Sequence, residues 1–492
     1  MKTCIRIRPE DNVATLLIDL KAGLTVPQTG ITAAQDIPYG HKVALSDIKE
    51  GAPVIKYGEV IGVATCDIRA GQWVHVHNCR SARDVVHAGP SGSGEGKSAG
   101  KGVPSTLKAP VLKGYRRPDG SFGLRNLVLV LSTSDLSNSS ARRVCLRVPD
   151  AVPICPGFGR CAIGEDLKQH FRTLEGLATN PNVYGVVIVS MEPTSAKTVL
   201  DRVLSTGRPA EAFDYDTAGG PTKLEALAQQ AAEKMVLEAS ALKREDMDVR
   251  NLVLGLECGG SDTTSGVISN AAIGLAADCV VQNGGTVVLS ETVEWIGAEE
   301  MLASRCKDGE TAEKVRASVR FYEDYVRSIG QDLRGSNPTP DNIRGGLTTI
   351  EEKALGSVKK GGSSPVSQLV RYAERPAKHG LVLMDAPAAG VENMTGLAAG
   401  GCQMILFSTG KGNPIGNPVA PAVKITGNPR TVANAAETID VDLSRVVTGD
   451  LSLDDAAAIL MEAAQLHANG KPVAAEILGT VDISISRAGY TV

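Results

Sequence analysis

The sequence predicts an α/β protein with a small β-rich N-terminal domain, a flexible linker, and a large body built on a mostly parallel sheet. Three observations lead to this class: a short motif repeated within the first 82 residues, a Gly/Ser/Lys-rich segment after it, and aliphatic runs alternating with helical segments from residue 113 onward. We divide the 492 residues into a β domain (1–82), a linker (83–112), a middle α/β domain (113–247) and a C-terminal domain (248–492).

The N-terminal domain contains the motif Asp-Ile-x-x-Gly-x-x-Val three times, at residues 36–43, 47–54 and 67–74. Each copy sets turn-forming Asp and Gly beside an aliphatic residue that leads into a short strand. Repeats this short cannot each bury a core. We therefore expect the copies to fold together as one β-rich module.

The linker contains the run AGPSGSGEGKSAGKGVPS, which has almost no large apolar side chains. Such a segment cannot offset the loss of chain entropy on ordering by burying apolar surface. It is long enough to let the small domain reach over the body or over a neighbouring subunit.

The body alternates short aliphatic runs, typical of buried parallel strands, with amphipathic helical segments. A helix is predicted over 222–246, and another begins at Ser452 with Asp455 in a capping-box position and ends before Gly470. The predicted strands are 127–131, 186–189, 252–256, 287–289, 381–384 and 404–407.

Polar and reactive residues follow these strands directly, as in ECGGSD after 252–256, SETVE after 287–289 and STGKGNP after 404–407. Ligands of open parallel sheets bind beyond the carboxyl ends of the strands, where these acids, the thiol, the lysine and the glycines would meet. The sequence therefore predicts a ligand site at this edge of the sheet. Polar residues that merely begin loops are the alternative.

Composition excludes several classes of function. The net charge is −4, the pI is about 6.1 and only 3% of residues are aromatic, so we expect neither nucleic acid nor membrane as a partner.

The first residues contain no apolar segment like that of a signal peptide, and the ten cysteines are scattered. We expect free thiols or metal ligands and a cytoplasmic location. A nicotinamide oxidoreductase is disfavoured because no Gly-x-Gly-x-x-Gly joins a strand to a helix.

Four motifs resemble the altronate/galactarate dehydratase family: GYRRPDG with GLRN at 114–126, GLECGGSD at 255–262, NPTP with GGLTTIEEK at 337–353, and STGKGNP at 408–414. The N-terminal module, with Val-His-Val-His-Asn at 74–78, resembles the family's SAF-type β-clip domain. The resemblance covers essentially the whole chain in the right order.

The resemblance implies a Rossmann-like C-terminal catalytic domain, a homodimer formed through the middle domain, and a divalent metal, Fe2+ first and Mn2+ or Mg2+ as alternatives. It also implies loss of water from C2–C3 of a sugar acid, an aldonate or aldarate, to give a 2-keto-3-deoxy acid. Removing the proton beside a carboxylate requires a positive charge to stabilise the enediolate, a general base, and an acid for the leaving hydroxyl.

Two alternatives stay open: elimination of sulfite from a small 2-hydroxy acid, as in the sulfolactate sulfo-lyase of this family, and a non-catalytic sugar-acid-binding protein.

Candidate residues follow from their chemistry and from the matched motifs. Cys258 lies in a Gly-rich turn after a strand, and thiolates bind iron. Cys161 lies where the family has a Gly-Cys element, and Glu291 would supply oxygen ligands. The predicted metal ligands are Cys161, Cys258 and Glu291, and the predicted catalytic residues are His77, Glu257 and Lys353. The predicted substrate-binding residues are His75, Asn78, Arg116, Arg125, Asn126, Ser261, Asp262, Lys411 and Asn413.

Several thiols of the family are missing from this chain. Ser357 stands where relatives have a Cys after the Glu-Glu-Lys motif, Met191-Glu192 replaces Gly-Cys-Glu, and Asp135 or Ser137 replaces the Cys after the first strand of the body. The segment 155–161 also lacks the family's His. If those thiols bind metal in relatives, this site has fewer sulfur ligands. If they only pack, their loss changes little.

Overall fold

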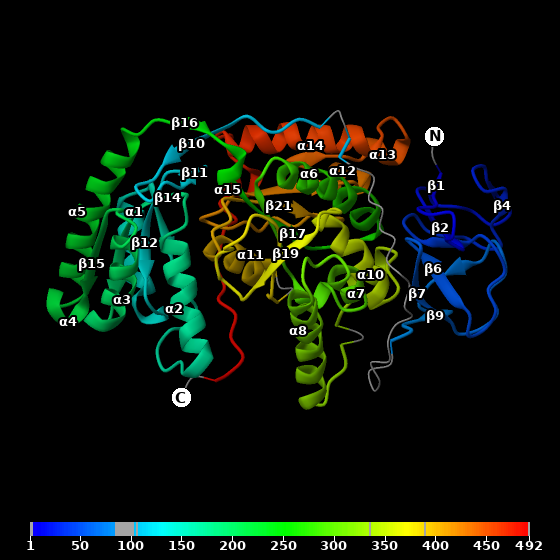
Figure 1. Ribbon diagram of the computed structural model, residues 1–492, viewed down its shortest axis with the longest axis horizontal. Coiled ribbons are helices and arrows are strands. Elements are labelled where there is room, and N and C mark those ends of the chain that lie inside the picture. Colours follow the sequence, from blue (N-terminus) through cyan, green and yellow to red (C-terminus); the bar gives the residue numbers. More distant parts are fainter. Residues whose placement is uncertain (1–2, 84–102, 105–106, 334–335, 388–389, 491–492) are drawn as a thin grey trace.

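The computed structural model describes residues 3–83, 103–104, 107–333, 336–387 and 390–490. It confirms the predicted class: a small β module at one end, a middle α/β domain at the other, and a seven-stranded parallel sheet between them (Figure 1). Most of the predicted linker, residues 84–102 and 105–106, lies outside the described residues.

The N-terminal module consists of short antiparallel strands in two main sheets and a small ribbon. The first sheet has the order β1-β2-β5-β8, from Cys4–Ile5, Val13–Leu16, Lys42–Ala44 and Trp73–Val74. The second has the order β6-β7-β9, from Pro53–Lys56, Glu59–Ala64 and Cys79–Arg80, and the ribbon pairs β3 (Thr25–Val26) with β4 (Ile31–Thr32).

The repeated motif has one structural role in every copy. Its isoleucine and valine are buried, and its glycine has a positive φ of 76° to 84°, which glycine adopts without strain. Residues 19–26 form a fourth copy, with Leu20 in place of isoleucine, which the sequence pattern did not single out. Asp19 Oδ1 accepts a hydrogen bond from the Tyr39 amide at 2.8 Å, and Asp36 Oδ1 accepts one from the Ala22 amide at 2.9 Å. The copies therefore brace one another in pairs.

The middle domain carries a four-stranded parallel sheet of order β13-β12-β14-β15, flanked by helices. Its strands are Ala151–Ile154, Leu127–Ser132, Val183–Ser190 and Ala210–Asp214. Its helices are η1 (Asp135–Ser137), α1 (Asn138–Arg147), α2 (Gly164–Ala178), α3 (Pro193–Leu204), α4 (Tyr215–Ala218) and α5 (Pro221–Ser240). A small antiparallel sheet joins β11 (Phe122–Gly123), β10 (Leu112–Arg116) and β16 (Glu245–Met247).

The predicted helix over 222–246 is too long at its C-terminal end. Helix α5 ends at Ser240, and residues 245–247 form β16, in which Met247 pairs with Leu112. Met247 is buried against the core, so strand pairing with a distant segment decides this conformation rather than helix propensity.

The C-terminal domain is built on a parallel sheet of order β19-β20-β18-β17-β21-β22-β23. Its strands are Val366–Val370, Gly380–Met384, Thr286–Leu289, Val253–Cys258, Met404–Ser408, Ala422–Thr426 and Val441–Asp442. Its helices are α6 (Asn270–Gln282), α7 (Glu299–Ala303), α8 (Gly309–Ser328), α9 (Pro340–Arg344), α10 (Ile350–Ser357), α11 (Gly390–Ala399), α12 (Pro429–Ala435), α13 (Arg445–Thr448), α14 (Leu453–Ala468) and α15 (Ala474–Leu478). Shorter helical turns are η2 (Val249–Asn251), η3 (Ser265–Ser269), η4 (Thr292–Glu294), η5 (Val358–Gly361) and η6 (Ala436–Thr438).

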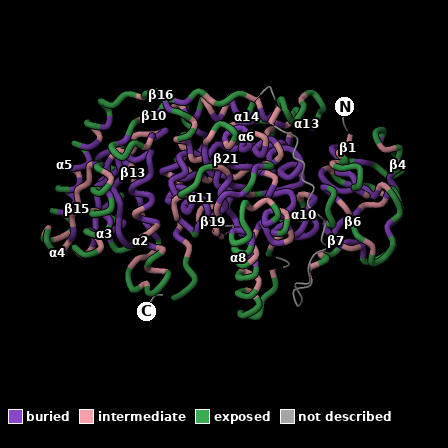
Figure 2. Tube along the Cα trace, viewed as in Figure 1, coloured by how far each residue is buried: buried purple, intermediate pink, exposed green. Residues whose placement is uncertain are grey.

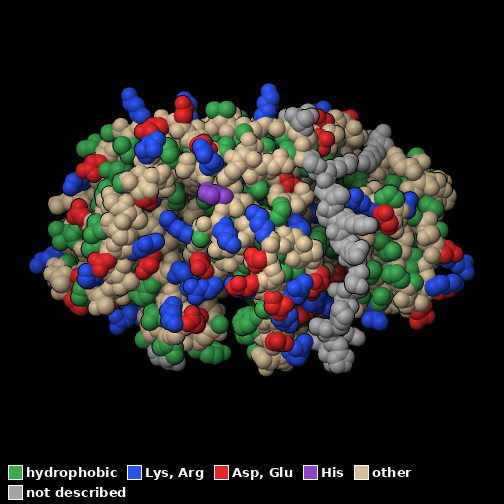
Figure 3. Space-filling view, in the orientation of Figure 1, with side chains coloured by type: hydrophobic (Ala, Val, Ile, Leu, Met, Phe, Trp, Pro, Cys, Tyr) green, Lys and Arg blue, Asp and Glu red, His purple; other side chains and the backbone are tan. Residues whose placement is uncertain are grey.

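All six predicted strands of the body are present, and α14 begins with the predicted capping box of Ser452 and Asp455. Helices cover both faces of the large sheet, so its strands are almost wholly buried (Figure 2). The segment Ser265–Gln282 is long and apolar enough to cross a membrane, but 78% of it is buried, where α6 packs against α14 and η5. Acidic and basic side chains interleave on the face seen in Figure 3.

The N-terminal module is docked on the body through a buried carboxylate. Glu352, at the start of α10, is fully buried and contacts Lys42 Nζ at 2.8 Å and Lys56 Nζ at 2.7 Å, both from the module. Burial alone would raise the pKa of Glu352, but the two ammonium groups outweigh it and lower that pKa to about 2. Apolar side chains of the module, among them Val54 and Ile61, also join the core of the body.

We predict that Glu352→Ala lowers the free energy of unfolding by about 3–5 kcal/mol, because it leaves two buried ammonium groups without their counter-ion. Denaturant titration at neutral pH measures this, and Glu310→Ala, an exposed glutamate on α8, is the control that should leave the midpoint unchanged. Because the folded pKa lies below the ordinary value of 4.5, the contribution of Glu352 is present above pH 4.5 and is lost as the pH falls towards 2. A midpoint for Glu352→Ala equal to that of wild type would contradict this role.

Candidate functional site

The site lies at the carboxyl ends of β17 and β21, where the order of strands in the sheet changes direction. This is where open parallel sheets bind ligands. The loop after β17 touches the loop after β21, because the Gly260 carbonyl accepts hydrogen bonds from the amides of Gly410 and Lys411 at 3.1 and 3.0 Å. Gly260 has a φ of 65°, a conformation that favours glycine.

A small cavity opens beside these loops, between the body and the N-terminal module. Its volume of about 10 Å³ holds roughly one water molecule, so a substrate must move its walls to enter. Polar side chains dominate its lining, which consists of Tyr57, Ser261, Asp262, Ser265, Gly266, Asn270, Leu347, Glu352, Lys353, Gly356 and Ser357. Of the predicted residues, the structure brings Ser261, Asp262 and Lys353 together here.

Asp262 is held rigidly at the cavity. Its Oδ1 accepts hydrogen bonds from Thr264 Oγ1 at 2.6 Å and from the Ser265 amide at 3.0 Å, and its Oδ2 accepts one from Asn428 Nδ2 at 2.7 Å. A carboxylate offers about four lone-pair positions, so acceptor capacity remains for a ligand. Of the two carboxylates in the lining, Glu352 is occupied by its lysines, and Asp262 contacts no ammonium group of the described residues within ion-pair distance.

Lys353 supplies a positive charge to the cavity. Its Nζ lies 2.8 Å from Glu294 Oε1 and donates to Asn337 Oδ1 at 2.6 Å. Burial alone would lower the pKa of Lys353, but Glu294 outweighs it and raises that pKa. Lys353 is therefore an ammonium group at neutral pH, suited to binding an anion rather than to accepting a proton.

Cys258 and Glu291 are neighbours below the cavity. Cys258 Sγ lies 3.7 Å from Glu291 Oε1 and 3.5 Å from Ser357 Oγ. Glu291 has a φ of 71°, uncommon for a residue other than glycine, and it contacts the buried Lys360 Nζ at 2.7 Å. Burial, and then the charge of Glu291, raise the pKa of the Cys258 thiol to about 12.

These residues do not fit a metal site as they are arranged. The ammonium of Lys360 already neutralises Glu291 and lies where a cation would have to bind that carboxylate. Cys161 is exposed on the middle domain, with a φ of 58°. Among the described residues, no three His, Cys, Asp or Glu side chains are grouped so that they could hold a metal ion.

Glu257 lies on the other face of β17 from Cys258, because side chains alternate along a strand. It accepts a hydrogen bond from Asn393 Nδ2, and its Oε1 has no hydrogen-bond partner among the described residues. Burial, and then the charge of Glu291, raise the pKa of Glu257 well above its ordinary value, while burial lowers the pKa of nearby Lys424 to about 7. Glu257 is not part of the cavity lining.

Side chains alternate along a strand, so a strand through residues 74–78 would place His75 and His77 on one side. The structure instead places these two predicted histidines on different sides. Strand β8 ends at Val74, and the chain then turns because Asn78 Oδ1 accepts from the His75 amide at 2.9 Å. His75 is buried and lies 3.3 Å from Thr348 Oγ1, whereas His77 is exposed beside Trp73. The Asn78 side chain is occupied with this turn, since its Nδ2 donates to the Trp73 carbonyl at 2.8 Å.

The predicted residues of segment 114–126 contact other parts of the chain and do not line this cavity. Arg116 pairs with Glu245 at 3.0 Å, and Arg125 pairs with Glu476 of α15 at 2.9 Å. Asn126 donates to the Ala239 carbonyl at 2.7 Å.

Lys411 and Asn413 lie on the loop after β21, outside the cavity lining. Lys411 is exposed and lies 3.8 Å from Asp341, and Asn413 Oδ1 accepts a hydrogen bond from the Ile415 amide at 3.1 Å.

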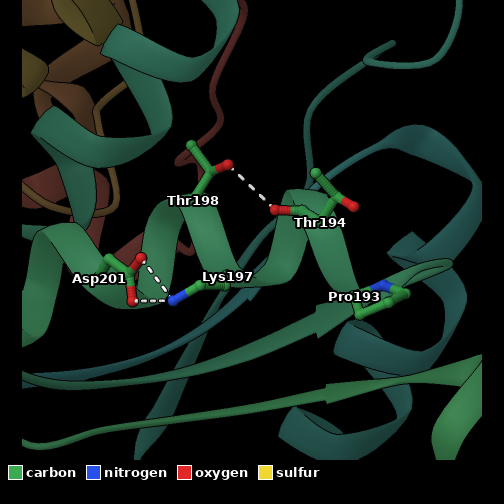
Figure 4. Close-up of a pocket in the computed structure, with 5 residues that line it drawn as sticks. All are labelled: Pro193, Thr194, Lys197, Thr198 and Asp201. Carbon is green, nitrogen blue, oxygen red and sulfur yellow. Dashed lines mark hydrogen bonds and ion pairs between the residues drawn. The ribbon is translucent and has the colours of Figure 1, made fainter.

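A second hollow lies on the surface of α3, lined by Pro193, Thr194, Lys197, Thr198 and Asp201 (Figure 4). Its only charged groups, Lys197 and Asp201, form an ion pair at 2.8 Å. This exposed hollow therefore contains no unpaired group for chemistry.

Comparison with known proteins agrees with the motifs. Family models for the galactarate/altronate dehydratase SAF domain, second domain and C-terminal domain match residues 2–82, 114–240 and 249–491. The chain is 33% identical to the altronate dehydratase of Escherichia coli over 99% of both chains. It belongs to the galactarate/altronate dehydratase family.

Other relatives match a part of the chain. The (2R)-sulfolactate sulfo-lyase subunit beta of Chromohalobacter salexigens is 40% identical over 77% of this chain and 98% of its own length. The subunit alpha of the enzyme from Paracoccus pantotrophus is 53% identical over 53 residues, which cover 11% of this chain and 79% of that subunit.

Sequence reasoning did not single out Tyr57, Lys360 or the three residues that dock the module. Lys42 follows a tight turn, and Lys56 and Tyr57 precede or form another, so their sequence context is typical of surface residues. Only the tertiary fold buries them against the body. Lys360 lies seven residues beyond the last residue of the matched Glu-Glu-Lys motif, which is the nearest sequence signal for it.

We predict that Cys258 resists alkylation in the native protein, because it is buried and its thiol pKa is near 12, while the exposed Cys66 and Cys161 react. Peptide mapping by mass spectrometry after iodoacetamide treatment at pH 7.5, with and without denaturant, measures this. Native labelling of Cys258 as fast as that of Cys161 would show that a reactive thiolate is present at the strand ends.

Proposed function

We propose that the protein eliminates water from a sugar acid, an aldonate or aldarate, to give a 2-keto-3-deoxy acid. The observation that carries this proposal is the polar cavity at the carboxyl ends of the sheet, where an unpaired carboxylate (Asp262), an ammonium group (Lys353) and several hydroxyl groups meet. A polyhydroxy carboxylate requires that combination: a cation for its acid group, hydrogen-bonding groups for its hydroxyls, and a base for the C2 proton.

Each of these residues has a distinct role in the proposal. Lys353 binds the substrate carboxylate and stabilises the negative charge that develops when the C2 proton leaves. Asp262 accepts that proton, since its fixed orientation and remaining lone pairs suit a base. Ser261, Ser265 and Ser357 bind substrate hydroxyls.

A second candidate is elimination of sulfite from a small 2-hydroxy acid. The specific observation in its favour is the 40% identity to a sulfolactate sulfo-lyase subunit beta over 77% of this chain, with a shorter match to a subunit alpha. Lys353 would then bind the substrate carboxylate, and the same base would remove the C2 proton.

The metal and the dimer remain predictions from the family resemblance. Fe2+ is expected first and Mn2+ or Mg2+ next, and supply of a positive charge to the enediolate is the chemistry that such an ion would add. Because the side chains at Cys258 and Glu291 do not fit a metal as arranged, no step is assigned to it here. A sugar acid as small-molecule partner is part of the same proposal.

We predict that the purified protein forms a 2-keto acid from at least one of altronate and galactarate, assayed without metal and with Fe2+, Mn2+ or Mg2+ added anaerobically. Sulfolactate is tested in parallel, and release of sulfite is measured beside 2-keto acid formation. Sulfite release alone would select the second candidate. Ligand-induced thermal stabilisation without any product would select a binding protein and overturn both.

We predict that Asp262→Asn lowers kcat by about 100-fold or more, the usual contribution of a general base, with KM changed little. Asp201→Asn, which breaks only the surface pair with Lys197 on α3, is the matched control and should keep full activity. Circular dichroism and a thermal melt establish that both variants are folded. A kcat for Asp262→Asn within about twofold of wild type would exclude Asp262 as the base.

A further inference from the structure

Tyr57 brings a phenol from the N-terminal module into the cavity of the body. It lies in the two-residue turn between β6 and β7, which pair Lys56 with Glu59. The side chain is only 6% exposed and contributes to the cavity lining beside Lys353 and Ser357.

The body is shaped to admit this phenol. A methyl group on Gly266 would lie 2.6 Å from Tyr57 Oη, and one on Gly356 would lie 3.2 Å from it. Two elements that are distant in sequence thus both have glycine where the phenol enters. Gly266 lies in η3, a π-helical turn at the start of α6, and such turns are frequent at functional sites.

The phenol oxygen has no hydrogen-bond partner among the described residues. Leaving a buried hydroxyl unsatisfied costs about 1–3 kcal/mol, and a phenylalanine would avoid that cost while filling the same space. A structural role for the ring therefore does not explain the hydroxyl, whereas a role towards a ligand in the cavity does.

The backbone at this turn supports the same conclusion. Tyr57 and Gly58 have φ values of 67° and 78°, as in a type I′ hairpin turn, where Asn, Asp or Gly is the usual first residue. A tyrosine in this conformation is strained. The turn would be more stable with asparagine, so the side chain, rather than the turn, accounts for the tyrosine.

We propose that Tyr57 contacts the leaving hydroxyl of the substrate and protonates it, which rests on the elimination of water proposed above. Asp262 takes the C2 proton, the electrons of the C2–H bond form the C2–C3 double bond, and the C3–O bond breaks. The departing oxygen takes the phenol proton and leaves as water, and the enol tautomerises to the 2-keto acid. The proton held by Asp262 returns to the phenolate through solvent, so the charges balance.

The surroundings of the ring suit this exchange. Lys359 Nζ and Lys56 Nζ lie 4.6 and 5.0 Å from the ring centroid, and their charge stabilises the phenolate after the proton has left. Burial raises the pKa of Tyr57 well above its ordinary value, so the phenol carries its proton at neutral pH, as a donor must.

Tyr57→Phe tests the proposal in the full-length protein. We expect kcat for water loss from altronate or galactarate to fall by about 100-fold or more while KM stays within about threefold, as for loss of a general acid. The melting temperature should stay the same or rise, because the variant removes an unsatisfied buried hydroxyl. Gly266→Ala, which would displace the phenol while Tyr57 remains, should lower kcat in the same way.

Tyr184→Phe is the matched control. Its exposed hydroxyl contacts only Glu238 at 3.1 Å in the middle domain, so activity and melting temperature should not change.

Three results would overturn the role of Tyr57. The first is an unchanged kcat for Tyr57→Phe. The second is a lower melting temperature of this variant, which would reveal a structural hydrogen bond. The third is sulfite release by wild type that Tyr57→Phe leaves intact, since sulfite departs as a stable anion without a proton. Wild-type protein inactive on every acid would instead refute the proposed function. The melting temperature of Tyr57→Phe would then still decide whether the hydroxyl is unbonded.

Discussion

The site depends on one buried carboxylate, Glu352, that belongs to the body and finds its counter-ions in another domain. An isolated ionised carboxylate in a protein interior is strongly unfavourable, and here two ammonium groups, Lys42 and Lys56, compensate it. Because both come from the N-terminal module, the pairing fixes where the module lies on α10. Tyr57 follows Lys56 directly, so the same contact determines how the phenol enters the cavity.

A second constraint comes from the topology of the parallel sheet. The carboxyl ends of parallel strands lie at one edge, so the loops after β17, β18 and β21 meet there although they are up to 150 residues apart in the chain. Charges buried at this edge are compensated internally: Glu291 by Lys360 and Glu294 by Lys353. Each of these lysines balances a buried carboxylate, and Cys258 is not part of the cavity lining.

Predictions from local sequence patterns agreed with the structure where local physics determines the conformation. The aliphatic strands and the capping box of α14 are examples, because hydrophobic periodicity and a side-chain cap are properties of a few adjacent residues. They failed at Glu245 and Asp246, where pairing with β10 replaces the end of the predicted helix. They also failed at His75 and His77, which a local turn of four residues places on buried and exposed sides. Arg116 and Arg125 suited an anion by chemistry, but acidic side chains at 245 and 476 already occupy them.

The sequence by itself determined the family, the α/β class and the edge of the sheet where the candidate site lies, because motifs and strand-loop patterns are local and are read directly along the chain. Only the tertiary structure decided which polar residues share the cavity. Asp262, Lys353 and Tyr57 come from the loop after β17, from α10 and from the N-terminal module, and their meeting depends on strand order and on the docking of Lys42 and Lys56 on Glu352. Contacts of this kind leave no periodic signal in the sequence, since burial and charge pairing act between residues about 300 positions apart.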